Sequence, residues 1–228
     1  MSPDERLAAW FRAQGRDLPW RETRDPYAIL VSEVMLQQTQ VARVTPRYLE
    51  WLIRWPAVED LAATSRADVI KAWQGLGYNR RAVNLHRAAQ VIASSGWPDD
   101  LTELPGVGRY TADAISCFAF GRDVLPLDVN IGRVLERSAM RFGSGAAQAL
   151  MDLGSTVCLA RVPRCDACPL AESCPSRGLR YAPLRKQGPF EGSFRQRRAQ
   201  ALRAALAGED PNDEEAVAAL RRDGLLPS

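Results

Sequence analysis

The chain has 228 residues, a quarter of them charged, and a formal net charge of +3. That length allows one large domain or two smaller ones, because domains usually hold about 100–200 residues. Charges within the first six residues predict no signal peptide, and no stretch approaches the ~20 apolar residues of a membrane span. We therefore expect a cytoplasmic protein in which thiols stay reduced.

The positive charge is carried almost entirely by arginine. Lys71 and Lys186 are the only lysines among the 30 basic residues. This composition leaves few candidates for any reaction that needs a lysine nucleophile.

Helical periodicity recurs along the chain, and strand patterns are nearly absent. Segments 66–78 and 79–93 each carry an apolar stripe of period 3.6, and the arginines of the second segment are expected on the outside. His86 in that segment is expected at the surface or against backbone. We predict an all-α protein of eight to eleven short helices. After a linker from about residue 175 to 193, two amphipathic helices form a small tail.

A glycine-rich turn separates two helical patterns in LPGVGRYTADAI, residues 104–115. Gly106 and Gly108 are expected to adopt conformations closed to other residues and to leave amides unshielded at a helix N-terminus, where an anion binds well. A hairpin of helices joined in this way can hold a nucleic-acid phosphate. Glycine needed for shape alone is the alternative.

Two carboxylates stand in apolar contexts. Glu33 lies inside the apolar segment DPYAILVSEVMLQQTQV, where burial would favour its protonated form, as a general acid requires. The alternative places Glu33 on an exposed stripe with Gln37. Asp128 ends an apolar run before a helix, so its simplest role is an N-cap. If both acids face one cleft, they suit cleavage of a glycosidic bond.

Four of the five cysteines lie in one short run, CLARVPRCDACPLAESCP. Thiolates so close together in a reducing compartment predict a metal site rather than disulfides. Zinc is the default for four thiolates, but zinc sites usually use two close pairs. A single close pair with one cysteine on each side also suits a cubane cluster. Cys117 is interpreted as a buried small hydrophobe.

Five ordered motifs resemble those of helix-hairpin-helix DNA glycosylases with an iron-sulfur cluster. They are SEVMLQQTQV, GLGYNRRAVNLH, LPGVGRYTADAI, LDVNIGRV and the C-x6-C-x2-C-x5-C spacing, between about residues 18 and 175. The first two are most similar to the adenine-specific mismatch glycosylases of the MutY type. The resemblance implies two helical subdomains with a DNA cleft between them. Residues 1–24 plus 128–180 would form the cluster subdomain, and 25–127 a helical barrel with the hairpin at about 101–121. Residues 181–228 would be linker and tail.

The resemblance also implies a role for each matching residue. Glu33 would protonate the adenine ring, and Asp128 would stabilise the cationic sugar. The remaining residues fall into three groups: Tyr110 and Asn130 beside Asp128; the DNA-binding and base-pocket residues Gln37, Tyr78, Trp20, Arg21, Gln148, Gly106 and Gly108; and the ligands of a [4Fe-4S] cluster, Cys158, Cys165, Cys168 and Cys174. Gln37 and Tyr78 would enter the duplex at the mispair. The cluster would hold the loop from Arg161 to Arg164 against the DNA backbone.

Tyr110 bears on the type of reaction. Bifunctional relatives such as endonuclease III have a lysine at this position, and neither lysine of this chain lies in a motif. The resemblance therefore implies a monofunctional enzyme that acts as a monomer on double-stranded DNA, releases adenine mispaired with 8-oxoguanine or guanine, and leaves an abasic site.

Two other functions remain open at this point. A thymine or uracil mismatch glycosylase of the same superfamily shares the tyrosine, the aspartate and the cluster. A non-catalytic hairpin protein that only binds DNA is the third possibility. Glu33 favours adenine, because departure of a purine is helped by an acid that protonates its ring. The tail is either a reduced DNA-contacting module or a structural element.

Overall fold

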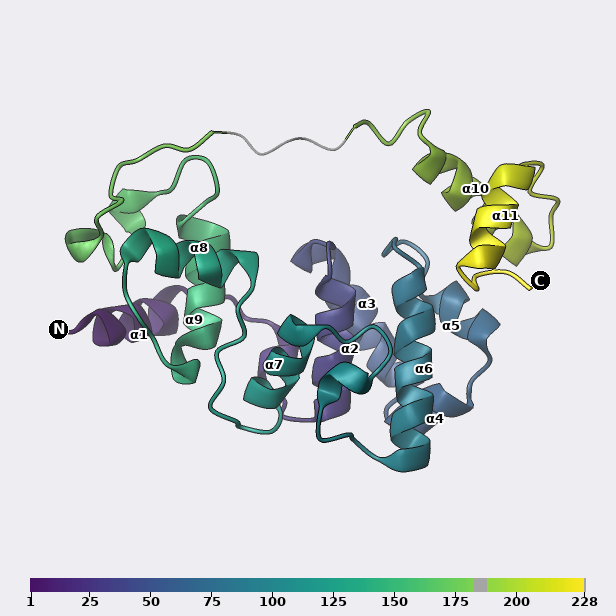
Figure 1. Ribbon diagram of the computed structural model, residues 1–228, viewed down its shortest axis with the longest axis horizontal. Helices are drawn as coiled ribbons and strands as arrows, with labels where there is room; N and C mark the ends of the chain where they lie inside the picture. Colours follow the sequence, from purple (N-terminus) through teal and green to yellow (C-terminus); the bar gives the residue numbers. More distant parts are fainter. Residues whose placement is uncertain (183–187, 228) are drawn as a thin grey trace. The chain divides into compact units, whose positions relative to one another are not determined.

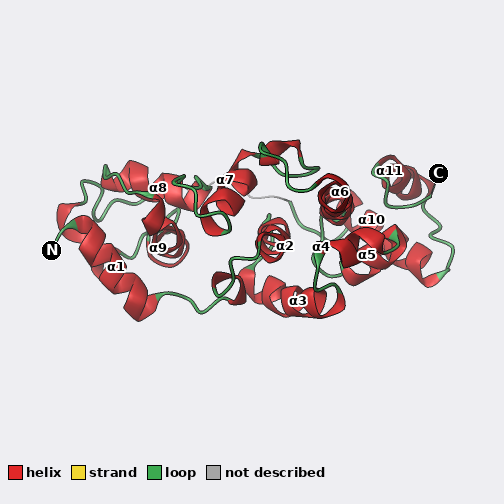
Figure 2. Ribbon diagram, turned by 90° about the horizontal axis from the view of Figure 1, so that it is seen from below, coloured by secondary structure: helices red, strands yellow, loops and turns green. Residues whose placement is uncertain are grey.

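A computed structural model describes residues 1–182 and 188–227. These residues form helices, turns and short single-turn segments, and none of them is in a strand (Figure 2). The α-helices are α1 (Pro3–Gln14), α2 (Pro26–Leu36), α3 (Val41–Arg54), α4 (Val58–Ala63), α5 (Arg66–Ala72), α6 (Arg80–Ser95), α7 (Arg109–Phe118), α8 (Val129–Ser138), α9 (Ala147–Asp152), α10 (Phe194–Ala207) and α11 (Glu214–Arg222). The all-α prediction is confirmed. None of the helices in the described residues is long and apolar enough to span a membrane.

The chain divides into two compact units. The first contains Met1–Leu30 and Gly108–Arg185, and the second contains Val31–Val107 and Lys186–Ser228. The sequence-based boundaries grouped residues 25–127 instead. The observed division assigns α7, the helix after the glycine turn, to the first unit.

The first unit is built around three helices that lie side by side. Helix α9 packs against both α1 and α8 (Figure 1). Their shared core holds Leu7 from α1, Ile131 and Val134 from α8, and Leu150 from α9. A turn of π-helix, Leu153–Val157, continues α9 and leads directly into the cysteine run. The same core therefore supports both Asp128, at the start of α8, and the cysteines.

The second unit packs α4 and α5 against the long helix α6. Trp51 of α3 contacts the rings of Trp55 and Trp73 edge-on, with ring centroids 4.6 and 5.5 Å apart. The buried stripes expected in segments 66–78 and 79–93 are confirmed, since Val69, Trp73 and Leu85 are all fully enclosed.

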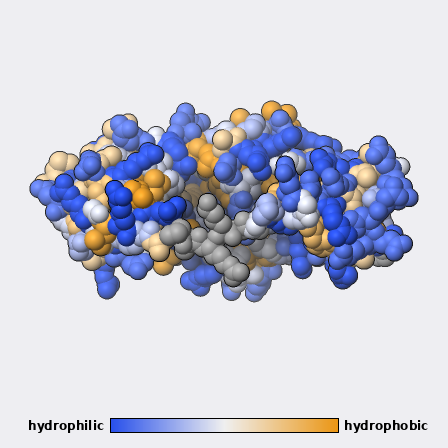
Figure 3. Space-filling view, turned by 90° about the horizontal axis from the view of Figure 1, so that it is seen from above, coloured by the Kyte–Doolittle hydropathy of each residue, from blue (hydrophilic) through white to orange (hydrophobic). Residues whose placement is uncertain are grey.

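The face shown in Figure 3 is largely hydrophilic, with apolar side chains in small separate patches.

The tail is a helical hairpin that completes the core of the second unit. Helices α10 and α11 pack on each other, and their apolar residues join Ile70 of α5 and Val83 of α6 in one cluster. The last helix begins at Glu214, with Asp213 as its N-cap. The contacts favour the structural interpretation of the tail. The predicted linker falls partly on residues 183–187, outside the described residues.

His86 of α6 is buried, and we expect its burial to make the stability of the fold depend on pH. Burial lowers the pKa of His86 from its ordinary value of 6.5, against hydrogen bonds with backbone at Thr64 and Ala62 that raise it. Its Nε2 atom is buried without a hydrogen-bond partner. Below about pH 6.5 the unfolded chain binds a proton that the folded chain resists, so stability falls as the pH drops through this window. A His86→Gln variant should show a shallower acid dependence in urea unfolding; an unchanged slope contradicts the assignment.

Candidate functional site

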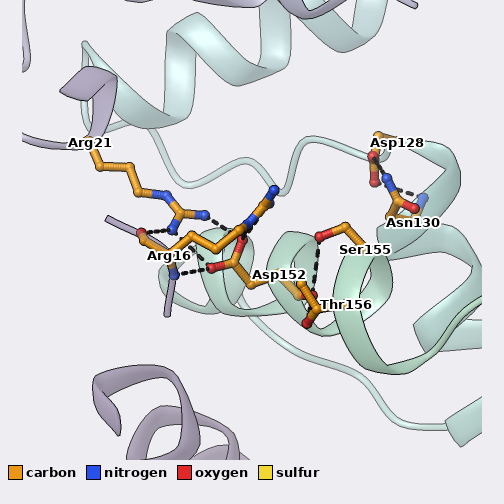
Figure 4. Close-up of polar contacts among 7 residues, drawn as sticks. All are labelled: Arg16, Arg21, Asp128, Asn130, Asp152, Ser155 and Thr156. Carbon is orange, nitrogen blue, oxygen red and sulfur yellow. Dashed lines mark hydrogen bonds and ion pairs between the residues drawn. The ribbon is translucent and has the colours of Figure 1, made fainter. Parts of the chain in front are cut away.

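Asp128 caps α8 with one carboxylate oxygen and holds Asn130 with the other. Its Oδ1 accepts hydrogen bonds from the backbone N–H groups of Asn130 (2.9 Å) and Ile131 (2.7 Å). Its Oδ2 accepts from Asn130 Nδ2 at 2.7 Å (Figure 4). The N-cap interpretation is therefore confirmed. The carboxylate is also partly exposed, so it is accessible to a ligand while its orientation is fixed.

Asn130 is held in turn by Arg133, one turn further along α8. Arg133 donates to Asn130 Oδ1 (2.7 Å), to the Gly154 carbonyl (2.6 Å) and to the Cys158 carbonyl (2.7 Å). The backbone at Gly154 lies close to Asn130. Only glycine fits there, because a Cβ on residue 154 would lie 2.7 Å from Asn130 Cβ. Sequence reasoning missed Arg133, although its position three residues after Asn130 puts both on one helix face. The result is a continuous polar connection from Asp128 to the first cysteine of the run.

Glu33 is buried in α2. Its side chain is 6% exposed, and its helix neighbours Ser32 and Val34 are buried as well. The alternative that placed Glu33 on an exposed stripe is wrong, because α2 is enclosed nearly all round rather than on one face. Gln37, just beyond the end of the helix, is only partly buried. A carboxyl group in such surroundings suits proton donation.

Tyr78 lies in the turn before α6 with its side chain 49% exposed. Its φ of 48° lies in the left-handed region, as does that of Gln38 at 57°. Bulky residues adopt this conformation rarely, and such positions cluster at functional sites. The alternative of a core tyrosine at a helix end is therefore wrong. The exposed ring is available to a ligand.

Arg21 is engaged in a buried ion-pair cluster. Both of its terminal nitrogens donate to Asp152, at 2.9 and 2.8 Å, and Arg16 contacts the same carboxylate (Figure 4). Burial alone would raise the pKa of Asp152, but hydrogen bonds from Arg21 and Arg16 lower it. The cluster ties the segment after α1 to the end of α9. Sequence reasoning missed Asp152 and assigned Arg21 to a base pocket, a role that stays a prediction, as do those of the partly buried Trp20 and Gln148.

The two hairpin glycines differ in the reason for their presence. Gly106 has a φ of 80°, and a Cβ there would lie 2.7 Å from Asn84 Cβ. Gly108 caps α7 with φ −87° and ψ 175°, which any residue can adopt, and a Cβ there would meet nothing. The expectation that both conformations are closed to other residues is thus wrong for Gly108. Its missing side chain instead leaves the start of α7 open, as an anion site requires.

This difference predicts opposite effects of alanine at the two positions. Gly106→Ala should destabilise the fold by about 1–3 kcal/mol, because it forces a left-handed backbone and a clash. Gly108→Ala should leave the melting temperature nearly unchanged and weaken binding of duplex DNA several-fold. Thermal unfolding and DNA titration of both variants measure this. Equal DNA affinity of Gly108→Ala and the unsubstituted protein would contradict an anion site here.

The four clustered cysteines line one cavity. Its wall also includes Arg137, Val157 and Pro163. Burial raises the pKa of Cys168, and the nearby Cys158, Cys174 and Cys165 raise it further. All four thiols are free. The sequence run therefore folds with its sulfur atoms around a common space.

Arg137 of α8 covers this cavity. Its guanidinium donates to the Cys158 sulfur at 3.7 Å and to the carbonyls of Leu159 (2.8 Å) and Ala160 (2.7 Å). The ring of Tyr181 lies over the same guanidinium, 3.5 Å away. The backbone N–H of Gly178 donates to the Cys165 sulfur at 3.3 Å. These donors suit thiolate ligands, whose charge they would stabilise.

Four thiols around one cavity could bind a single ion or a cluster, and the two differ in the spacing of the sulfur atoms that they need. Zinc with Zn–S bonds of about 2.3 Å holds its four sulfur atoms within about 4 Å of one another. A cubane cluster binds each thiolate through a different iron atom and so needs a wider arrangement.

Tyr110 occupies the second position of α7 and is partly exposed. Lys71 is an exposed residue of α5, and Lys186 lies outside the described residues. Cys117, which was interpreted as a buried residue, is only half-buried. Its partial burial raises the pKa of its thiol, and the nearby charge of Asp123 raises it further.

Comparison with known proteins identifies the family. A model of the HhH-GPD superfamily of base excision DNA repair proteins matches residues 31–148. This chain belongs to the HhH-GPD superfamily. The matched segment includes Glu33, the glycine turn and Asp128, whereas the four clustered cysteines follow it in the chain.

Within the HhH-GPD superfamily, this chain belongs with the adenine DNA glycosylases. It is 42% identical to the adenine DNA glycosylase of Mycobacterium tuberculosis, over 91% of this chain and 80% of that protein. The human adenine DNA glycosylase is 38% identical, over 82% of this chain and 42% of that protein. The structure is also similar to that of a thermostable thymine-DNA glycosylase. That match has a TM-score of 0.68 and 28% identity, over 75% of this chain and 93% of that one.

Proposed function

We propose that this protein is a DNA glycosylase that hydrolyses the bond between adenine and deoxyribose, where adenine is mispaired with 8-oxoguanine or guanine. The observation that carries the proposal is a buried carboxyl group, Glu33, in a chain that is 42% identical to an adenine DNA glycosylase over 91% of its length. The proposal assigns this carboxyl group the role of general acid toward the purine ring, a role that carboxyl groups shielded from bulk water often take.

The proposed reaction uses the two carboxylates in different roles. Glu33 donates a proton to the adenine ring, so that the base leaves as a neutral molecule. Asp128, oriented by Asn130 and the start of α8, stabilises the positive charge that develops on the sugar. Water then adds to the sugar carbon, and an abasic site remains. In this reaction both acids act on the same nucleotide, Glu33 on its base and Asp128 on its sugar.

We further propose that the enzyme cleaves no strand. A lyase step needs an amine that attacks the sugar, and the position that carries lysine in bifunctional relatives holds Tyr110. Strand scission should therefore require added alkali. Covalent trapping of DNA on this protein by borohydride would contradict the proposal.

The proposal also includes an iron-sulfur cluster. Cys158, Cys165, Cys168 and Cys174 would hold a [4Fe-4S] cluster in the cavity that they line. When bound, it would supply a rigid cross-link within the loop 158–174, and Arg137 of α8 contacts that loop at the Cys158 sulfur. We expect Cys165→Ser to lower the iron content, the visible absorbance and the affinity for duplex DNA together. Normal affinity in an iron-free preparation would contradict this.

The central experiment compares four duplexes under single turnover, with and without alkali. They carry adenine opposite 8-oxoguanine, adenine opposite guanine, thymine opposite guanine, and uracil opposite guanine. We expect base release from the two adenine duplexes. Release from the pyrimidine mispairs alone would favour the thymine or uracil activity that the similarity to the thymine-DNA glycosylase suggests. Binding without release would favour a non-catalytic protein.

A further inference from the structure

The arginines of α6 were all expected to lie outside, and for Arg81 this is wrong. Arg81 is 9% exposed, whereas the side chain of the adjacent Arg80 is 73% exposed. Burial lowers the pKa of Arg81 to about 10, with the nearby Tyr78 raising it, so the guanidinium keeps its charge at neutral pH. A buried charge of this kind requires partners that compensate for lost hydration.

One terminal nitrogen of Arg81 binds the end of α2. Its NH1 group donates to the carbonyls of Val34 (2.8 Å), Met35 (2.9 Å) and Gln37 (2.5 Å). The last carbonyls of a helix lack partners within the helix and carry partial negative charge. Arg81 therefore caps α2 from another helix and fixes the backbone of Gln37.

The other terminal nitrogen binds the turn that carries Tyr78. Its NH2 group donates to the carbonyls of Leu76 (3.2 Å) and Gly77 (3.0 Å) and to Thr39 Oγ1 (2.9 Å). The guanidinium carbon lies 5.5 Å from the centroid of the Tyr78 ring. Thr39 Oγ1 also contacts the Leu76 carbonyl, at 3.2 Å, which joins the two segments a second time.

Both segments have backbone that is held in an uncommon conformation. Gln38, directly after Gln37, and Tyr78 itself are two of the four non-glycine residues with positive φ in the described chain. Such residues persist only where their surroundings fix them. Arg81 donates hydrogen bonds to the residues directly before these two, at the carbonyls of Gln37 and Gly77.

We infer that Arg81 is a positioning residue that holds Gln37 and Tyr78 together as one wedge for entry into the duplex. This inference rests on the proposed function, and on the role in the duplex that the family resemblance implies for these two side chains. Lysine cannot replace Arg81, because a single ammonium group lacks the fork that reaches both segments.

The test measures base unstacking separately from base release. The duplex carries adenine opposite 8-oxoguanine and 2-aminopurine as the 5′ neighbour of that adenine. Its fluorescence rises when stacking is disrupted. We expect a rise on saturation with the unsubstituted protein, and no more than about half of that rise with Arg81→Lys. The single-turnover rate of adenine release should fall about tenfold or more, since small misplacements cost large factors in rate.

Arg80→Lys is the matched control, because it changes the neighbouring arginine in the same way without touching either segment. Its fluorescence rise should equal that of the unsubstituted protein. Melting temperatures within a few degrees of each other for all three proteins exclude general unfolding as the cause. An Arg81→Lys signal equal to that of the control, or no rise with the unsubstituted protein, would overturn the inference.

If Arg81→Lys fails to fold, Thr39→Val decides the question. This change removes only the hydroxyl group that Arg81 and Leu76 share, and we expect a smaller fluorescence rise in the same direction. Thr45→Val is its control, because the Thr45 hydroxyl bonds only within α3, to the Val41 carbonyl at 3.1 Å. Equal signals from both threonine variants would overturn the inference. Failure of the proposed activity would appear separately, as absent adenine release by the unsubstituted protein.

Discussion

Replacing Glu33 by glutamine is expected to reduce adenine release by a factor of about 100 to 10,000, the usual contribution of general acid catalysis. Glutamine has nearly the same shape and can hydrogen-bond, but it cannot donate a proton to the purine. The buried position of Glu33 makes the loss severe, because little bulk water reaches this position to replace the acid. Single-turnover rates on adenine opposite 8-oxoguanine measure the effect.

The control for this experiment is Glu103→Gln, which makes the same change at an exposed residue of the single-turn segment Leu101–Glu103. We expect its rate to equal that of the unsubstituted protein. DNA affinity of Glu33→Gln should change little, because phosphate contacts supply much of the binding energy. A Glu33→Gln rate within about threefold of the control, far less than general acid catalysis contributes, would remove Glu33 from the mechanism.

Replacing Asp128 by asparagine should separate the structural role of this residue from its chemical role. Asparagine caps helices about as well as aspartate, so the bonds from the Asn130 and Ile131 amides can persist. The negative charge is lost, and with it the stabilisation of the cationic sugar. We expect the melting temperature to change by only a few degrees, and the rate of adenine release to fall by about 100-fold or more.

Alanine at the same position provides the comparison. Asp128→Ala removes both the cap and the charge, so it should cost about 1 kcal/mol in stability in addition to the lost activity. Unfolding in urea and single-turnover rates, measured on both variants, distinguish the two roles. Substantial activity in Asp128→Asn, with a loss only in Asp128→Ala, would show that the cap alone matters.

The contacts of Arg133 give the cysteine run a direct structural route to Asp128. Arg133 binds the Cys158 carbonyl and Asn130, and Asn130 binds Asp128. The π-helical turn before Cys158 brings the Gly154 carbonyl to the same guanidinium. We therefore expect a change in the loop 158–174 to alter the surroundings of the Asp128 carboxylate.

The sequence by itself determined the features that depend on neighbours in the chain. The apolar stripes of α5 and α6, the N-cap role of Asp128 and the left-handed glycine at 106 follow from helical periodicity and backbone sterics. The gathering of the four cysteines around one cavity likewise follows from the sequence, because all four lie within residues 158–174. The ordered motifs added the family, which the comparisons confirm.

Only the tertiary structure decided which polar side chains are buried, because their partners are far away in the sequence. Arg21 meets Asp152 across 131 positions, and Arg81 meets the end of α2 across more than 40. Periodicity assigns a charged residue to the outside, since burial without partners is costly, and a single segment cannot reveal distant partners. The burial of Glu33 was left open for the same reason: its helix alone could not indicate that other elements enclose it on all sides.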